Sequence, residues 1–319
     1  MTRRSGAELA ALLLTQRLVE GSAPPLKAGE FWALVAAVGD LGRLLGLDAT
    51  QIAAAAGIDL VAAQRLVVLL DGATAFAFAL DQAEQGGLQL LVATGGAYPS
   101  RLTARLHAAA PPVLYVLGDP DLLGRTLLGI VGSRAVGDEG ARVSEGAAAL
   151  AVAQGMGIVS GGAHGVDRLA MDAALEAGGV VVGVLADSLL RASRHPPARR
   201  AMSAGTLCLC SPYQPDAPFS AAQALGRNKL IYALSAATLV VACQEESGGS
   251  WAGAVDALRR QTAPVLVWSG VGAPPGNQAL AAKGAVPVDD LERLLPLPAT
   301  PEPPPVPAQP GERQLALGL

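Results

Sequence analysis

The chain has 319 residues, with 23 lysines and arginines against 27 acidic residues and a formal net charge of −4. This charge argues against a protein that coats duplex DNA by bulk electrostatic attraction. No apolar run reaches the roughly 18 residues of a membrane helix, and no uninterrupted apolar stretch follows the basic N-terminus as in a signal peptide. The three cysteines show no metal-binding spacing. We therefore expect a cytoplasmic protein without a metal, cofactor or membrane anchor.

Residues 1–87 are predicted to form a small helical domain. The stretch "GEFWALVAAVGDLGRLLG" has apolar residues at helical spacing. In "DATQIAAAAGIDLVAAQRLVVLLD", Asp48 is expected to cap one helix, and a break at Gly57 precedes a second. Two short helices joined by a tight glycine turn resemble a helix-hairpin-helix or SAM-like module. An ordinary helical bundle fits the pattern equally well.

From residue 88 short apolar runs alternate with helical stretches. These runs are "LQLLVA", "VLYVLG", "LLGIVGS", "GIVSGG", "VVVGVLAD", "LCLCS", "TLVVAC" and "PVLVWSG". Several are apolar throughout, which is typical of strands buried on both faces. Strands separated by helices predict a parallel sheet with crossover helices. We therefore predict an α/β fold, a Rossmann-like parallel sheet over residues 88–296, behind the N-terminal helical domain.

Glycine and serine follow most of the predicted strands in place of bulky residues. The three main segments are Gly132-Ser133-Arg134, Ser160-Gly161-Gly162 and Gly248-Gly249-Ser250. Ligands of open parallel sheets bind at the carboxyl ends of the strands. Glycines allow close approach to backbone N–H groups, helix N-termini favour anions, and arginine grips phosphate through two parallel hydrogen bonds. The pattern predicts a phosphate-binding edge.

A second cationic segment is "GRNKLIYALS", with Arg227, Asn228 and Lys229 placed at the expected start of a helix. Cations at a helix N-terminus oppose the helix dipole, and a bound phosphate removes that conflict. The alternative is that both cations are solvated. His164 is interpreted as structural, and Asp167 as the cap of the helix 168–177.

Arginines also cluster in "RASRHPPARR". Arg191, Arg194, Arg199 and Arg200 surround His195. A local basic groove and a solvated loop are equally good interpretations of this cluster.

The ordered run of motifs resembles the DprA/Smf family of bacterial DNA-processing proteins. It is carried by Tyr98-Pro99, by "PPVLY", by Gly132-Ser133-Arg134, by "SGGAHGVDRLAMDAALEAGG", by "GRNKLIYALS", by "ESGGSWAGA" and by "GNQALAAKGA". The resemblance spans roughly residues 40–290.

The resemblance implies a non-enzymatic protein that binds and protects single-stranded DNA in natural transformation, loads the recombinase RecA onto it and works as a homodimer. Carried over by position, the implied DNA-binding residues are Gly132, Ser133, Arg134, Ser160, Gly161, Gly162, Arg227, Asn228, Lys229, Gly248, Gly249 and Ser250.

Two departures from the family pattern concern the site and the C-terminus. Family members often carry Phe-Pro before the Arg-Asn pair, where the ring can stack on a base, whereas this chain has Ala224-Leu225. The nearest upstream aromatic residues are Phe219 and Tyr213. Many members also carry a C-terminal winged-helix domain, in whose place this chain has a proline-rich segment.

Two other function classes remain open. Phosphoribohydrolases of the same superfamily carry Pro-Gly-Gly-x-Gly-Thr-x-x-Glu with a catalytic glutamate, and "ESGGSWAGAVDAL" lacks that threonine and glutamate. A sensor of a free nucleotide needs only the phosphate-binding edge.

Residues 297–319 are predicted to form an extended, proline-rich tail, since proline removes backbone donors and disfavours helix. Its end, with Gln314, Leu315, Leu317 and Leu319, resembles the sliding-clamp-binding peptide of a bacterial DNA polymerase. A frayed leucine-rich terminus explains the same residues equally well.

Overall fold

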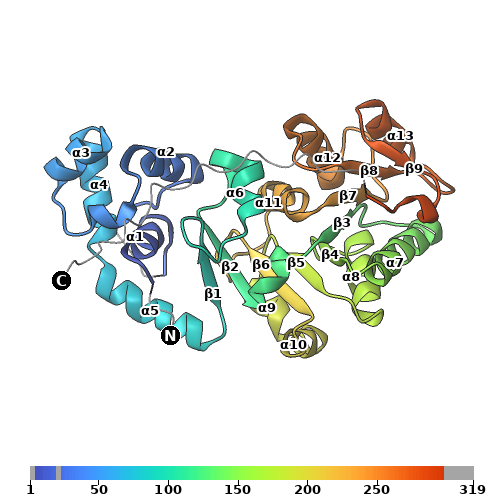
Figure 1. Ribbon diagram of the computed structural model, residues 1–319, viewed down its shortest axis with the longest axis horizontal. Coiled ribbons are helices and arrows are strands. Elements are labelled where there is room, and N and C mark those ends of the chain that lie inside the picture. Colours follow the sequence, from blue (N-terminus) through green and yellow to red (C-terminus); the bar gives the residue numbers. More distant parts are fainter. Residues whose placement is uncertain (1–3, 19–22, 298–319) are drawn as a thin grey trace, which may run out of the picture.

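The structure is a computed structural model that describes residues 4–18 and 23–297. The tail prediction, with the clamp peptide Gln314, Leu315, Leu317 and Leu319, lies outside these residues. The N-terminal helices lie at one end of an elongated molecule, and a single sheet with helices on both faces forms the rest (Figure 1). The predicted fold class is confirmed.

The N-terminal region consists of helices, as predicted. They are α1 (Gly6–Thr15), α2 (Ala28–Val38), α3 (Ala49–Ala56), α4 (Leu60–Leu70) and α5 (Ala73–Gln85), with a 3-10 turn at Leu41–Leu44. The Asp48 carboxylate accepts from the Gln51 N–H at 2.9 Å, so the expected cap of α3 is confirmed. The α3–α4 turn places Gly57 at φ 64°, a left-handed conformation that suits glycine.

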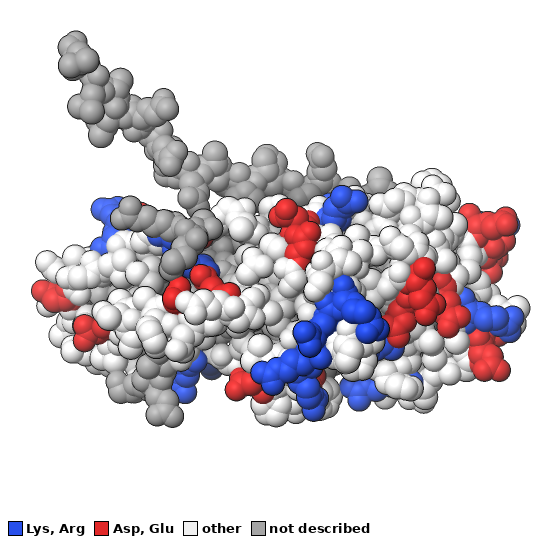
Figure 2. Space-filling view, turned by 90° about the horizontal axis from the view of Figure 1, so that it is seen from below, with Lys and Arg blue, Asp and Glu red and all other residues white. Residues whose placement is uncertain are grey.

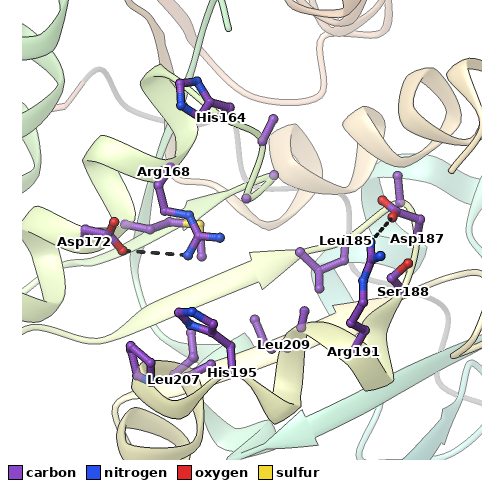
Figure 3. Close-up of a pocket in the computed structure, with 18 of the residues that line it drawn as sticks. His164, Arg168, Asp172, Leu185, Asp187, Ser188, Arg191, His195, Leu207 and Leu209 are labelled. Carbon is purple, nitrogen blue, oxygen red and sulfur yellow. Dashed lines mark ion pairs between the residues drawn. The ribbon is translucent and has the colours of Figure 1, made fainter.

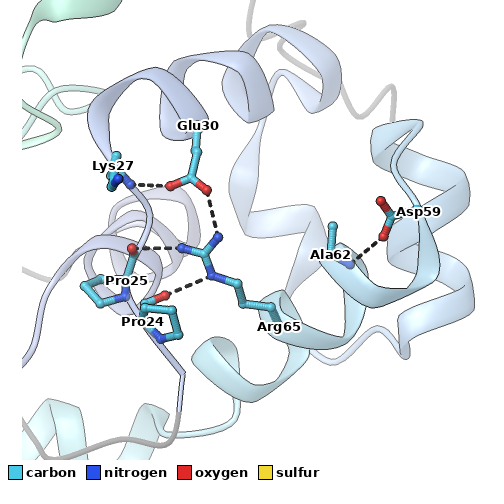
Figure 4. Close-up of polar contacts among 7 residues, drawn as sticks. All are labelled: Pro24, Pro25, Lys27, Glu30, Asp59, Ala62 and Arg65. Atoms are coloured by element: carbon cyan, nitrogen blue, oxygen red, sulfur yellow. Dashed lines mark hydrogen bonds and ion pairs between the residues drawn. The ribbon is translucent and has the colours of Figure 1, made fainter.

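Arg65 of α4 holds this region together. Its guanidinium pairs with Glu30 of α2 at 2.7 Å and donates to the carbonyls of Pro24 and Pro25 at 3.0 and 2.9 Å (Figure 4). Arg65 is also the one cation between Asp48 and Asp71. Within the described helix pair α3–α4, the one cationic side chain is therefore already bonded to the protein itself.

The sheet has nine strands in the order β1-β2-β6-β5-β4-β3-β7-β8-β9. Their bounds are β1 Gln89–Val92, β2 Val113–Gly118, β3 Leu127–Val131, β4 Gly157–Ser160, β5 Val181–Val184, β6 Leu207–Ser211, β7 Ala237–Val240, β8 Val265–Trp268 and β9 Val286–Val288. Each predicted apolar run contains a strand, and β9 was not predicted. Two of its three residues are exposed, so it lacks the apolar signal of a buried strand.

All strands from β6 to β9 in this order are parallel, whereas β2 is antiparallel to both β1 and β6. The prediction of a parallel sheet therefore fails at this edge. Only a short 3-10 turn at Pro120–Gly124 separates β2 from β3, too short for a crossover helix. The chain reverses there, and β2 pairs with β6, which is distant in sequence.

Helices cover both faces of the sheet (Figure 1). One face carries α7 (Asp138–Ala153), α8 (Val166–Glu176), α9 (Leu189–Arg194) and α10 (Pro196–Ser203); the other carries α6 (Ser100–Leu106), α11 (Ala221–Leu234), α12 (Gly248–Arg260) and α13 (Pro275–Ala282). Two apolar cores lie between these layers and the sheet.

The core beneath α7 and α8 continues into the N-terminal helices, where Leu12 belongs to the same cluster as Tyr115 of β2. Trp32 of α2 also donates from its indole N–H to the Ala110 carbonyl at 2.8 Å. The predicted domain boundary at residue 87 falls between α5 and β1. The boundary stays a prediction, because the apolar core that contains Leu12 and Tyr115 extends across it.

The order in which the chain adds strands to the sheet reverses at β3. From β3 the chain adds β4, β5 and β6 on one side, then returns to add β7, β8 and β9 on the other. Ligands of open α/β sheets bind near such a reversal, at the carboxyl ends of the strands.

Within the described residues, no single helix has the length and apolar character to cross a membrane. The pair α3 and α4 meets that test only jointly, across a bend of 114°.

Candidate functional site

A groove of about 960 Å³ opens at the carboxyl ends of β4 and β5. It runs between α8 on one side and α9 with α10 on the other (Figure 3). Its floor is apolar and includes Met171, Leu185 and Leu209, and its rim includes Arg134 from the loop after β3. The volume lies in the range of small-molecule and nucleotide sites.

Positive charge predominates in this groove. The lining contains the arginines Arg134, Arg168, Arg191, Arg200 and Arg227, the histidines His164 and His195, and the acids Asp172, Glu176 and Asp187. Two of the arginines lie near acids in loose ion pairs, Arg168–Asp172 at 3.9 Å and Arg191–Asp187 at 3.8 Å (Figure 3). Pairs of this length contribute little to stability, so both guanidinium groups can also contact a ligand in the groove.

Arg134 and Phe219 form a pair on the rim. The Arg134 guanidinium carbon lies 5.3 Å from the centre of the Phe219 ring, a cation–π contact, and Phe219 is 54% exposed. A ring this exposed contributes little to the core. The pair therefore offers a charged group and an aromatic face side by side.

Arg227 contributes to the lining of the groove, but its guanidinium is bonded within the fold. Its side chain is buried, with Nη1 donating to the carbonyls of Gly161 at 2.6 Å and of Val184. These bonds join the ends of β4 and β5. Burial lowers the pKa of Arg227, and the neighbouring Asp167 opposes that change. Its Nε has no hydrogen-bond partner among the described residues. Its Nη1 nevertheless connects the segments that follow β4 and β5.

Gly161 lies between Arg227 and Asp167. A Cβ on Gly161 would come within 2.2 Å of Arg227 Nη1 and 2.6 Å of Asp167 Oδ2, and the Gly161 N–H donates to Asp167 at 3.1 Å. Similarly, a Cβ on Gly132 would lie 2.6 Å from Val166. The sequence argument assigned both glycines to ligand approach, but the packing of the chain itself already requires them.

Among the other predicted residues in the segments at the ends of β3 and β4, Gly162 lines the groove, whereas Ser160 is buried in the interior. Gly162, at φ 67°, lines the groove, and the Ser133 carbonyl accepts from the Val166 N–H at 3.3 Å. Ser160 is completely buried and its hydroxyl donates to the Ile130 carbonyl at 2.5 Å. This geometry argues against Ser160 as a phosphate ligand.

The third predicted segment lies outside the groove. Gly248, Gly249 and Ser250 begin α12, and the side-chain amide of Asn228 donates to the Gly249 carbonyl at 3.0 Å. Two exposed acids, Glu245 and Glu246, precede this helix end and oppose anion binding there. The segments that the sequence predicted to form one phosphate-binding edge therefore lie at two separate sites, the groove and the N-terminus of α12.

Lys229 does not line the groove, and its ammonium is bonded elsewhere. Its ammonium donates to the Ala109 carbonyl at 2.7 Å, and burial together with nearby Arg260 lowers its pKa. The prediction that Arg227 and Lys229 stand at a helix start is wrong, since α11 begins at Ala221, capped by Ser220. The dipole conflict inferred from the sequence does not exist.

The sequence also gave Asp167 the wrong role. Helix α8 begins at Val166, one residue before it, and the Asp167 carboxylate is buried against backbone N–H groups of the β3 and β4 loops. His164 is exposed, with Nδ1 3.5 Å from the Arg134 carbonyl. No group of three or more potential metal ligands occurs in the part of the chain that the structure describes.

Asp167 makes the stability of the protein pH-dependent. Burial raises its pKa to about 6, against the effect of Arg227 and the backbone donors. Between about pH 3.9, the value in an unfolded chain, and pH 6, the folded state holds a proton that the unfolded state releases. The free energy of unfolding therefore falls as pH rises through this window, by about 2–3 kcal/mol.

Urea unfolding of wild type and Asp167→Asn at pH 4 and pH 7 tests this effect. The stability of wild type relative to the variant is expected to be lower at pH 7 by that amount. A difference that is the same at both pH values would contradict it.

The sequence profile of the DNA recombination-mediator protein A family matches residues 89–297 of this chain. The chain belongs to that family. Protein Smf of Escherichia coli (strain K12) is 32% identical over 219 residues, 66% of this chain and 57% of that protein. The putative DNA processing protein DprA of Mycobacterium tuberculosis (strain ATCC 25618 / H37Rv) is 32% identical over 152 residues, 46% of this chain and 39% of that protein. The chain thus spans about half the length of these relatives.

Two solved structures of this family resemble the fold. DNA processing protein A (DprA) from Streptococcus pneumoniae has a TM-score of 0.65 at 22% identity, covering 85% of this chain and 97% of its own. DNA processing protein A from Helicobacter pylori, whose structure describes a single-stranded DNA binding mode, has a TM-score of 0.53 at 24% identity, covering 65% and 93%. At these identities the likeness shows the fold alone.

In this family member, sequence reasoning missed part of the groove. Arg168 lies within the segment "SGGAHGVDRLAMDAALEAGG", but no ligand role was predicted for it. Phe219 was noted only as the nearest upstream aromatic, and its contact with Arg134 depends on folding. The arginine cluster at residues 191–200 was noted, and its placement beside the groove was left open.

Proposed function

We propose that this chain binds single-stranded DNA through the groove between α8 and the α9–α10 segment, protects it, and passes it to RecA as a recombination mediator. Membership of the family supports this proposal, and so does the positive lining of the groove. Homodimer formation and clamp binding through Gln314, Leu315, Leu317 and Leu319 belong to the same proposal.

The exposed Phe219 ring beside Arg134 carries the proposal. In proteins that bind single strands, bases stack on aromatic rings while cations follow the phosphates, and each stacked base contributes about 1–3 kcal/mol. Arg134 and Phe219 supply both groups at one point of the rim. Phe219 takes the role that an aromatic at position 224 plays in other members.

Duplex DNA fits this arrangement poorly. Its bases are stacked inside the helix, so Phe219 cannot reach a free base face without unpairing. A free nucleotide can occupy the same groove, so the nucleotide sensor named above is the competing function.

Fluorescence anisotropy separates these functions. We expect a labelled oligothymidylate of about 20 nucleotides to bind at least about tenfold more tightly than the matching duplex, because only the single strand offers base faces for stacking. AMP and ATP at micromolar concentrations are expected not to displace it. Equal affinity for duplex, or displacement by micromolar nucleotide, would contradict the proposal.

A further inference from the structure

Helices α9 and α10 form a short hairpin that is unusually rich in arginine. Residues 189–203 contain Arg191, Arg194, Arg199 and Arg200, all exposed, and no acidic residue. Helix α10 has no fully buried residue, so its place in the fold does not rest on a deeply packed face.

Most of these charges have no acidic partner. Arg194, Arg199 and Arg200 form no ion pair with any residue that the structure describes, and Arg191 lies 3.8 Å from Asp187. By contrast, the exposed arginines Arg142, Arg259 and Arg293 each pair with an acid three or four residues away. Like charges gathered without partners repel one another, and a bound polyanion removes that repulsion.

Helix dipoles explain only part of this cluster. Arg191 and Arg194 occupy the last turn of α9, and Arg200 the last turn of α10, where cations are favourable. Arg199 lies outside these turns. The dipoles also give no reason for the absence of acids over fifteen residues.

The hairpin separates two hollows. On one side Arg191, His195 and Arg200 line the groove that Arg134 borders. On the other side Arg194 and Arg199 line a hollow of about 630 Å³ between the hairpin and α5. In the view from below in Figure 2, lysine and arginine side chains form a continuous group near the centre of the molecule. The positive surface of the groove therefore continues over the hairpin.

We propose that the α9–α10 hairpin is a second phosphate-binding surface, along which a single strand held at Arg134 continues toward α5. This inference rests on the proposed function and extends it. The guanidinium groups bind successive phosphates by paired hydrogen bonds and need no base sequence. Short strands then occupy the groove alone, and longer strands also reach Arg194 and Arg199.

The test compares two oligothymidylates, of about 8 and about 24 nucleotides, one within and one beyond the site sizes of about 4–16 nucleotides that single OB folds occupy on single strands. In the variant Arg194→Gln/Arg199→Gln, affinity for the longer strand is expected to fall about tenfold, with a salt slope smaller by about 1.4 from two lost contacts. Affinity for the shorter strand is expected to stay unchanged. Both residues lie outside the groove and are exposed, so the variant retains the fold, which its melting temperature verifies.

Arg293→Gln is the matched control, because it removes an exposed arginine that is paired with Asp289. It is expected to bind both strands as wild type does. Wild-type affinity of the double variant for the longer strand would overturn the second surface, while the proposed function would stand on its dependence on Arg134. Failure of wild type to bind either strand would overturn both.

Discussion

Replacing Arg134 with glutamine is expected to weaken binding of a single-stranded oligothymidylate by about 10- to 100-fold. The change removes a charged hydrogen-bond donor on the rim of the groove, and bonds to charged groups contribute about 1.5–3 kcal/mol. The salt slope is expected to fall by about 0.7 for one lost phosphate contact. Anisotropy titrations at several salt concentrations measure both quantities.

Two further variants make this result specific. Phe219→Leu removes the ring but no charge, so it is expected to lower affinity at an unchanged salt slope. Lys229→Ala removes a cation whose ammonium lies against the Ala109 carbonyl, away from the groove, and is expected to leave DNA affinity unchanged. Loss of binding in Lys229→Ala with wild-type binding in Arg134→Gln would place the strand elsewhere.

Replacing Arg227 with methionine is expected to destabilise the protein by about 3–5 kcal/mol, because it leaves the buried Asp167 charge without its compensating cation. It also leaves the carbonyls of Gly161 and Val184 without their donor. Urea unfolding followed by circular dichroism measures the loss.

The double variant Arg227→Met/Asp167→Asn provides the control. It removes both buried charges, so part of the lost stability is expected to return. If Arg227→Met instead keeps wild-type stability and loses only DNA binding, then Arg227 is a ligand residue, as the sequence first indicated, and its structural role is refuted.

The local pattern of the chain determined most of the fold. Runs of apolar residues such as Leu127–Val131 are typical of strands buried on both faces, and helical stretches between such strands indicate crossovers, so the α/β class was predicted from the sequence. Capping is equally local, and Asp48 was identified correctly as the start of a helix. The pairing partner of β2 was not predictable, because the residues of β6 that it pairs with, such as Cys208 opposite Gly118, follow 90 or more positions later.

The site divided in the same way. The sequence located the strand ends, and it identified Arg134 and Gly162, which line the groove. Only the tertiary structure decided which polar groups stay free for a ligand. Arg227, Ser160 and Lys229 are bonded to carbonyls contributed by distant segments, and the Phe219–Arg134 contact joins residues 85 positions apart. Composition and spacing show which polar groups of the chain could bind a ligand. Burial and hydrogen bonding in the tertiary structure decide which of these groups are already bonded within the protein.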